Sequence, residues 1–150
     1  VNELGFDAAV NYKADTLYGD LREATPDRVD VIFDNVGGPL LDTLFRRLGI
    51  GARIIVSGAT SQYNNETIYG PTNYLALATM RARMEGFIIF DYENRYQAAR
   101  AEMIEWLKRG DLKLVENMVD GEVGDYPNVL HRLYEGANVG KMLLRLPAAN

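Results

Sequence analysis

Two short apolar runs in the first half of the chain predict neighbouring strands of a buried sheet. Residues 29–33 and 54–56 are mostly apolar, and each run stops at polar residues and glycine. Such runs are typical of strands that are covered on both faces, and the glycines indicate sharp turns after them. The segment between them opens with Pro39, carries apolar residues at helical spacing up to Leu48 and meets Gly49, where we expect the helix to end. Parallel strands joined by a helix form a right-handed crossover, and ligands bind beside the carboxyl ends of such strands.

The rest of the chain continues to alternate between strand and helix patterns. Further strands are expected over residues 7–12, 84–90, 112–119 and 141–146. Further helices are expected over residues 16–25, 73–82, 94–110 and 125–136. The polar, turn-rich residues 61–71 predict an exposed loop over the strand ends. This alternation indicates an α/β fold with a mainly parallel sheet.

The composition narrows the class of protein. The chain has 150 residues, a formal net charge of -5, no cysteine and one histidine. Without a basic stripe it is not expected to bind nucleic acid or an anionic membrane. The absence of cysteine excludes disulfides, zinc-thiolate sites and cysteine nucleophiles, and we expect no metal site. With no apolar run of about 18 residues and no signal peptide at its start, the sequence predicts a soluble, cytoplasmic protein.

Several familiar cofactor motifs do not occur in the sequence. There is no G-x-G-x-x-G turn, which a dinucleotide-binding sheet uses between its first strand and helix. The string at residues 136–142 is one residue short of a P-loop and lacks the hydroxyl group that would bind magnesium. No tyrosine stands four residues before a lysine, which excludes the short-chain dehydrogenase pair in which lysine lowers the tyrosine pKa.

Five strings along the chain together resemble one enzyme family. They are FDAAVNYK at residues 6–13, FDNVGG at 33–38, GATSQYN at 58–64, RMEGFIIFDY at 83–92 and NVGK at 138–141. In this order and at these separations they are similar to the zinc-independent, NADP-dependent double-bond reductases of the medium-chain dehydrogenase/reductase superfamily. This group contains the prostaglandin reductases, the leukotriene B4 12-hydroxydehydrogenases and the alkenal/one oxidoreductases.

The resemblance covers the later part of the family's pattern. Residues 1–150 would be the C-terminal part of a nucleotide-binding Rossmann domain, with strands three to six of its parallel sheet. The first βαβ unit and the amino-terminal, GroES-like catalytic domain would be absent, so we expect a fragment. In the strand order 3-2-1-4-5-6, the strands at residues 7–12 and 29–33 are third and fourth, which would leave a gap of roughly 14 Å between them. We expect the chain to close this gap by rearranging or to pair its open edges with another copy, and we expect a homo-oligomer, a dimer.

The resemblance also implies which residues meet the cofactor NADP. Asn35 would lie near the nicotinamide, and residues 57–63 would follow the cofactor. The backbone of residues 87–89 would hold the carboxamide, and Tyr12 would lie near the adenosine phosphate end. The full set is Tyr12, Asn35, Ser57, Gly58, Ala59, Thr60, Ser61, Gln62, Tyr63, Phe87, Ile88, Ile89 and Asn138. Plainer interpretations stay open: helix capping for the two asparagines, a solvated loop for residues 57–63, and packing for the apolar and aromatic members.

The implied reaction is hydride transfer from NADPH to the β-carbon of a small-molecule enal or enone. Negative charge then develops on the carbonyl oxygen and needs a hydrogen-bond donor. Tyr63 is the candidate catalytic residue because a phenol stays protonated at neutral pH, and Tyr69 on the same loop is the alternative. Two other functions stay open, a non-catalytic fragment that acts only in association and an NADPH quinone reductase. Tyr63 and Asn64, with the loop after them, favour the enone reductase.

Overall fold

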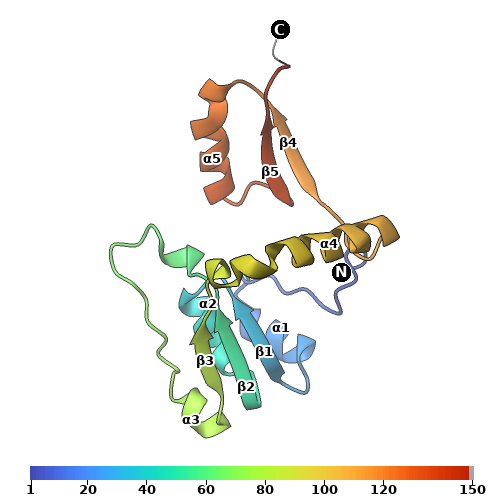
Figure 1. Ribbon diagram of the computed structural model, residues 1–150. Helices are drawn as coiled ribbons and strands as arrows, with labels where there is room; N and C mark the ends of the chain where they lie inside the picture. Colours follow the sequence, from blue (N-terminus) through green and yellow to red (C-terminus); the bar gives the residue numbers. More distant parts are fainter. Residues whose placement is uncertain (149–150) are drawn as a thin grey trace. The chain divides into compact units, whose positions relative to one another are not determined.

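The computed structural model describes residues 1–148, which form two compact units (Figure 1). The first unit comprises Val1–Glu93, and the second begins at Asn94. Each unit contains its own parallel sheet, with three strands in the order β1-β2-β3 in the first and the pair β4-β5 in the second. The α/β fold with parallel strands that the sequence predicts is therefore confirmed.

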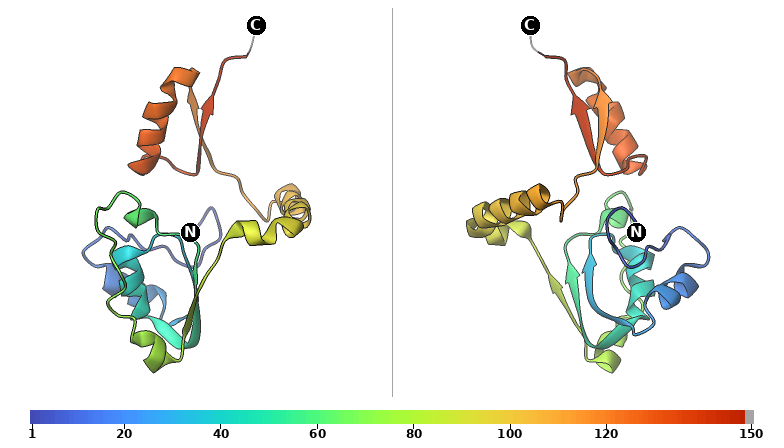
Figure 2. Two further views of the ribbon diagram at one scale, coloured as in Figure 1. Left: turned by 60° about the vertical axis from the view of Figure 1, so that its left-hand side comes forward. Right: turned by 90° about the vertical axis from the view of Figure 1, so that its right-hand side faces the viewer.

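The first unit alternates strands with short helices. Its strands are β1 (Val29–Asp34), β2 (Leu48–Val56) and β3 (Arg83–Gly86). Its helices are α1 (Leu17–Ala24), α2 (Gly38–Phe45), α3 (Ala76–Met80) and the 3-10 helices η1 (Thr60–Gln62) and η2 (Ile89–Arg95), the last of which runs to the start of the second unit. Both views of Figure 2 show α1 and α2 on the same side of the three-stranded sheet.

The core of the first unit lies on one face of the sheet. Its buried cluster consists of Ile32, Leu41, Phe45, Leu48, Ala52 and Ile54, and apolar residues of α3 pack against it. Because alternate residues of a strand point to opposite faces, Val31 and Phe33 point away from this core, and they are 60% and 61% exposed. The expectation that both faces are covered is wrong for β1, since the helices of this unit gather on one face.

The helix that the sequence predicts up to Leu48 is shorter in the structure. Leu48 is the first residue of β2 and pairs with Val29 of β1. The glycines that follow lie where the register of the two strands shifts. A Cβ on Gly49 would lie 2.9 Å from Oδ1 of Asp30, and Gly51 has a φ of +76°. Both conditions favour glycine, so these residues allow a bulge in β2 and do not end the helix.

Residues 7–12 form no strand, in contrast to the prediction. A strand needs a neighbour for its backbone groups, and within the described part of the chain this stretch pairs with none. It folds into turns instead, in which Asn11 Oδ1 accepts the Lys13 N–H at 3.0 Å. This stretch therefore does not close the expected gap, and pairing with another copy stays a prediction.

The third strand of the first unit is shorter and more exposed than expected. All four residues of β3 are exposed, because β3 is an edge strand with β2 as its one neighbour. One further bond, from the Phe87 N–H to the Val56 carbonyl at 2.9 Å, extends the pairing before the chain turns into η2. Helix α3 is likewise shorter than predicted, while residues 61–71 are mostly exposed, as predicted.

The second unit contains one parallel strand pair and its helices. Its elements are α4 (Tyr96–Arg109), β4 (Glu116–Asp120), η3 (Val123–Asp125), α5 (Tyr126–Tyr134) and β5 (Lys141–Arg145). Gly110, with a φ of +79°, ends α4 as predicted, whereas the residue before the helix is Arg95 and not the expected Asn94. Neither α4 nor α5 buries the full apolar stripe that its sequence predicts, since Val129 is their one buried residue. No helix within residues 1–148 is apolar and long enough to cross a membrane.

A matched pair of substitutions in β2 tests the core of the first unit. Ile54 is completely buried, whereas Ile50 in the same strand is 69% exposed. Ile54→Ala leaves a cavity, so we expect it to lower the free energy of unfolding by about 2–5 kcal/mol. Ile50→Ala should lower it by less than about 1 kcal/mol, because it changes only strand propensity. Urea unfolding of the full-length protein measures both changes, and equal losses would contradict this placement of the core.

Candidate functional site

Backbone hydrogen bonds join the turns that follow β1 and β2. The N–H groups of Ser57 and Thr60 donate to the carbonyls of Asp34 and Asn35 at 2.8 and 3.0 Å, and a third bond from Ser61 continues the row. These bonds extend the pairing of the two strands beyond their ends. The two predicted cofactor-binding segments, at Asn35 and at residues 57–63, therefore lie side by side.

The first of these turns is built on Asp34, which is only 4% exposed. Its Oδ1 accepts the N–H groups of Val36 and Gly37 at 3.0 Å each. Gly37 and Gly38 have φ values of +67° and +61°, a region that favours glycine. A Cβ on Gly38 would also lie 2.6 Å from Nε2 of Gln62. The turn thus needs glycine for its backbone conformation and for the close approach of the second turn.

Asn35 and Tyr63 meet over the backbone of Gly58. A Cβ added to Gly58 would overlap with Asn35 Oδ1 and would lie 3.0 Å from Tyr63 Oη. Tyr63 is 65% exposed, and its Oη accepts a long hydrogen bond from the Ala59 N–H at 3.4 Å. The Asn35 amide and the Tyr63 phenol, which come from two different turns, therefore lie close together at an exposed place on the surface. Because the phenol oxygen is the acceptor in this bond, its O–H can still donate to another group.

A hollow of about 500 Å³ lies at the carboxyl ends of β2 and β3. The predicted residues that line it are Ser57, Gly58, Ala59, Tyr63, Phe87 and Ile88. The half-buried Phe87 ring packs edge-on against Phe33, with centroids 6.0 Å apart. Its N–H is bonded to β2, so the backbone role expected for residues 87–89 depends on the other groups of that stretch.

A second hollow, of about 280 Å³, lies at the start of α2. Tyr12 and Ser61 line it together with Gly37 and Pro39. The Ser61 hydroxyl is not free, because it donates to the Val36 carbonyl at 2.6 Å. The predicted residues that line a hollow are therefore divided between two hollows, while Asn35, Thr60, Gln62 and Ile89 line neither of them.

Gln62 supports the loop and does not line either hollow. It is 9% exposed, its Oε1 accepts the Tyr69 N–H at 2.8 Å and its Nε2 donates to Ser61 Oγ at 2.7 Å. Thr60 and Ile89 are exposed and also lie outside both linings. A cofactor role for these three residues stays a prediction.

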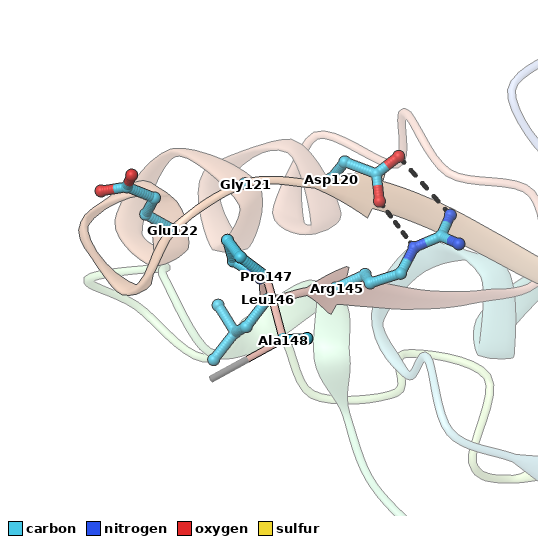
Figure 3. A pocket seen from close by; sticks show the side chains of 7 residues that line it. All are labelled: Asp120, Gly121, Glu122, Arg145, Leu146, Pro147 and Ala148. Carbon is cyan, nitrogen blue, oxygen red and sulfur yellow. Dashed lines mark hydrogen bonds and ion pairs between the residues drawn. The ribbon is translucent and has the colours of Figure 1, made fainter. Parts of the chain in front are cut away.

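Asn138 belongs to the second unit, in the turn before β5. Its Nδ2 donates to the Gly140 carbonyl at 2.6 Å. The same unit holds a hollow of about 360 Å³ that is lined by residues 120–122 and 145–148 (Figure 3). Arg145 and Asp120 form an exposed ion pair there at 2.6 Å, which is worth little in water. Asn138 does not line this hollow, so its predicted role also stays open.

Asp42 is a buried acid on α2 that was not predicted from the sequence and is 5% exposed. Its Oδ1 accepts the N–H groups of Thr72 and Asn73 at 2.8 and 3.0 Å. Its Oδ2 accepts the hydroxyls of Tyr69 and Thr72 at 2.7 and 2.6 Å. One feature of the sequence could have indicated that Asp42 is buried. It stands in a mostly apolar helix, three residues before Phe45, and residues at this spacing lie on the same side of a helix.

These contacts set the ionisation of the two groups. Burial raises the pKa of Asp42, but hydrogen bonds from Thr72, Tyr69 and Asn73 outweigh it and hold the pKa below the ordinary 3.8. The pKa of Tyr69 is raised above 10.0, chiefly because its hydroxyl donates a hydrogen bond to the Asp42 carboxylate. The stabilisation from the Asp42 carboxylate is full above pH 3.8 and is lost as the pH falls through the lowered pKa. The stabilisation from the neutral Tyr69 hydroxyl is full below pH 10.0 and is lost as the pH rises through the raised pKa.

The hydrogen bond to Asp42 also bears on the choice of the catalytic residue. Because the Tyr69 hydroxyl already donates to Asp42, Tyr63 is the better candidate for the hydrogen-bond donor to the substrate.

Comparison with curated proteins reveals relatives over nearly the whole chain. It is 38% identical over 144 residues to the NADP(+)-dependent 2-alkenal reductase of Nicotiana tabacum and 36% identical over 149 residues to the NADPH-dependent curcumin reductase of Escherichia coli. Each match covers 95% of this chain, but 42% and 43% of the relatives. The chain therefore spans less than half the length of the curated relatives that it matches.

A solved structure and a family profile agree with these matches. The crystal structure of CurA from Vibrio vulnificus in complex with NADPH is 34% identical, has a TM-score of 0.86 and is matched over 97% of this chain and 44% of its own. This likeness supports the expected Rossmann-type fold. The profile described as zinc-binding dehydrogenase matches residues 4–144. Together with the five sequence strings, this match shows that the chain belongs to the zinc-binding dehydrogenase family of the medium-chain dehydrogenase/reductase type.

Proposed function

We propose that the full-length protein uses NADPH to reduce the carbon–carbon double bond of α,β-unsaturated aldehydes and ketones, and that this chain supplies the nicotinamide side of the cofactor cleft. The observation that carries the proposal is the meeting of Asn35 and Tyr63 over Gly58, where two parallel strands end. Ligands of parallel sheets bind at this edge. The relatives' names point to the same chemistry, since one is an NADP(+)-dependent 2-alkenal reductase and CurA was crystallised with NADPH.

The residues around the larger hollow fit the nicotinamide end of such a cofactor. Gly58 carries no side chain, so the polar ends of Asn35 and Tyr63 can both lie against its backbone at the edge of the hollow. The Asn35 amide offers both a donor and an acceptor, which match the two groups of a carboxamide. Phe87 and Ile88 add an apolar wall. When bound, NADPH supplies the hydride.

Tyr63 is the residue to which we assign the polar step of the reaction. Hydride addition to the β-carbon moves a pair of electrons onto the carbonyl oxygen of the substrate. A phenol hydroxyl at this oxygen can donate a hydrogen bond that becomes stronger as the charge develops. The long bond from the Ala59 N–H occupies an acceptor site of Tyr63 Oη and leaves its O–H for donation to the substrate. The electron pair then returns from the oxygen as the α-carbon takes a proton from water, which completes the saturated carbonyl product.

The residues of this chain do not fit a zinc site, although the family description names zinc. The sequence has no cysteine and one histidine, and Nε2 of that His131 lies 3.2 Å from Glu135. Residues 1–148 contain no group of three or more histidine, aspartate or glutamate side chains arranged to hold an ion. The reaction that we propose is zinc-independent, and no step of it passes through a metal.

The first prediction of this proposal concerns the Tyr63 hydroxyl. In the full-length protein, Tyr63→Phe should lower kcat for NADPH-dependent enone reduction by roughly 10–100-fold, because one donor to the developing negative charge is lost. The affinity for NADPH should change little. Tyr74→Phe is the matched control, since Tyr74 is 58% exposed and lies outside the lining of the hollow. An unchanged rate in Tyr63→Phe, or NADPH oxidation with quinones but with no enal or enone, would contradict the proposal.

A second prediction concerns the close packing of Asn35 and Tyr63 against Gly58. Gly58→Ala adds a methyl group where Asn35 Oδ1 lies, so Asn35 or Tyr63 must move. We expect the dissociation constant for NADPH, measured by fluorescence titration, to rise about tenfold or more, which corresponds to about 1.4 kcal/mol. The control is Gly70→Ala, because a Cβ on Gly70 meets nothing within 4 Å. Equal NADPH affinity in the two variants would show that cofactor binding does not depend on the placement of Asn35 and Tyr63 at Gly58.

A further inference from the structure

We propose that Asp42 positions the loop that carries Tyr63, and so fixes where the hydrogen-bond donor of the candidate site stands. The inference rests on the function proposed above, because it concerns the same site. Asp42 lines neither the larger hollow nor the one at the start of α2. It acts through other residues and is therefore a positioning residue.

The loop in question is held by its own hydrogen bonds mainly at its start, where the Asn65 N–H donates to the Gln62 carbonyl at 3.1 Å and Asn65 Nδ2 donates to the Ser61 carbonyl at 3.2 Å. It joins η1 to α3 and runs along one side of the first unit (Figure 1). Residues 63–70 are all exposed, and Ile68 is 79% exposed. A segment that buries so little apolar surface opens readily unless polar contacts restrain it. Beyond the contacts at its start, the path of the loop from Tyr63 onward depends on how its far end is attached to the folded part of the unit.

Two buried side chains, Gln62 and Asp42, hold this loop by hydrogen bonds to Tyr69, and we call these bonds the tie of the loop. Gln62 accepts the Tyr69 N–H, while Asp42 accepts the Tyr69 hydroxyl. The segment between Gln62 and Tyr69 is therefore held at both of its ends. Tyr63 is the first residue of this segment. In the described part of the chain, the hydrogen bonds that join residues 69–73 to α2 all end on Asp42, including one from Asn73 Nδ2 to its backbone carbonyl at 3.2 Å.

A carboxylate suits this position better than any neutral side chain. Four donors point at the two side-chain oxygens of Asp42, and an ionised carboxylate is acceptor-only. Bonds to a charged acceptor away from water are stronger than those to a neutral one. An asparagine would offer one oxygen and an NH₂ group, so both hydroxyls would have to turn from donating to accepting. The charge of Asp42 therefore determines how firmly the loop is held.

Hydrogen–deuterium exchange on the full-length protein tests the tie directly. We expect amide exchange within residues 63–72 to become about tenfold faster or more in Asp42→Asn and in Tyr69→Phe, because each removes part of the tie. Tyr69→Phe leaves the core of α2 untouched, so it decides the question even if Asp42→Asn does not fold. The control is Tyr74→Phe, which lies on the same connection but has no part in the tie, and whose exchange should match the wild type.

Enone reduction kinetics separate positioning from a purely structural role. Tyr69→Phe should lower kcat, but it should cause no further loss in a Tyr63→Phe background, because the group that it positions is already gone. Losses that multiply in the double variant, or an unchanged exchange rate in both single variants, would overturn the inference. If the wild-type protein reduces no enone, the proposed function fails, while the exchange rates still decide whether Asp42 holds the loop.

Discussion

The parallel pairing of β1 with β2 is the constraint on which the first unit depends. It holds Ile54 in the core beneath α2, and it brings the carboxyl ends of both strands to one edge. The pairing continues past the strands as backbone hydrogen bonds between the two turns. Asn35 and Tyr63 are far apart in the sequence, but both of their side chains consequently lie against the backbone of Gly58. The candidate site is thus a product of strand register, and a change of register would separate its parts.

This edge must be closely packed and yet well fixed. Glycine lets the two turns approach each other closely, but it also allows the chain more freedom. Buried polar side chains supply the missing restraint, namely Asp34 for the first turn, Gln62 for the second and Asp42 for the far end of the loop. Burying such groups is unfavourable unless their hydrogen bonds are made. Within residues 1–148, Asp34 Oδ2 is the one buried side-chain oxygen or nitrogen without a hydrogen-bond partner. The other buried polar atoms of Asp34, Gln62 and Asp42 make hydrogen bonds, which offset the cost of burying them.

Sequence patterns were sufficient to predict the strands whose apolar runs are clear and the adjacency of their ends. They failed where a residue's role depends on a partner far away in the chain. Leu48 continues the helical spacing of α2, yet its pairing with Val29 places it in β2. Residues 7–12 have a strand pattern, but a pattern alone cannot supply the neighbouring strand that they need. The role of Asp42 was not predicted from the sequence, because its donors come from residues 69–73, 27 to 31 positions further along.

The central claim is that the ends of β1 and β2 hold the reacting part of a reduced pyridine nucleotide beside a phenol. A crystal structure of the full-length protein with NADP⁺ and an unreactive enone analogue tests it most directly. We expect the nicotinamide ring over Gly58, its carboxamide bonded to Asn35 or to the backbone after β3, and the enone oxygen about 3 Å from Tyr63 Oη. Electron density for the nicotinamide away from this edge, or an enone oxygen out of reach of Tyr63, would contradict the account.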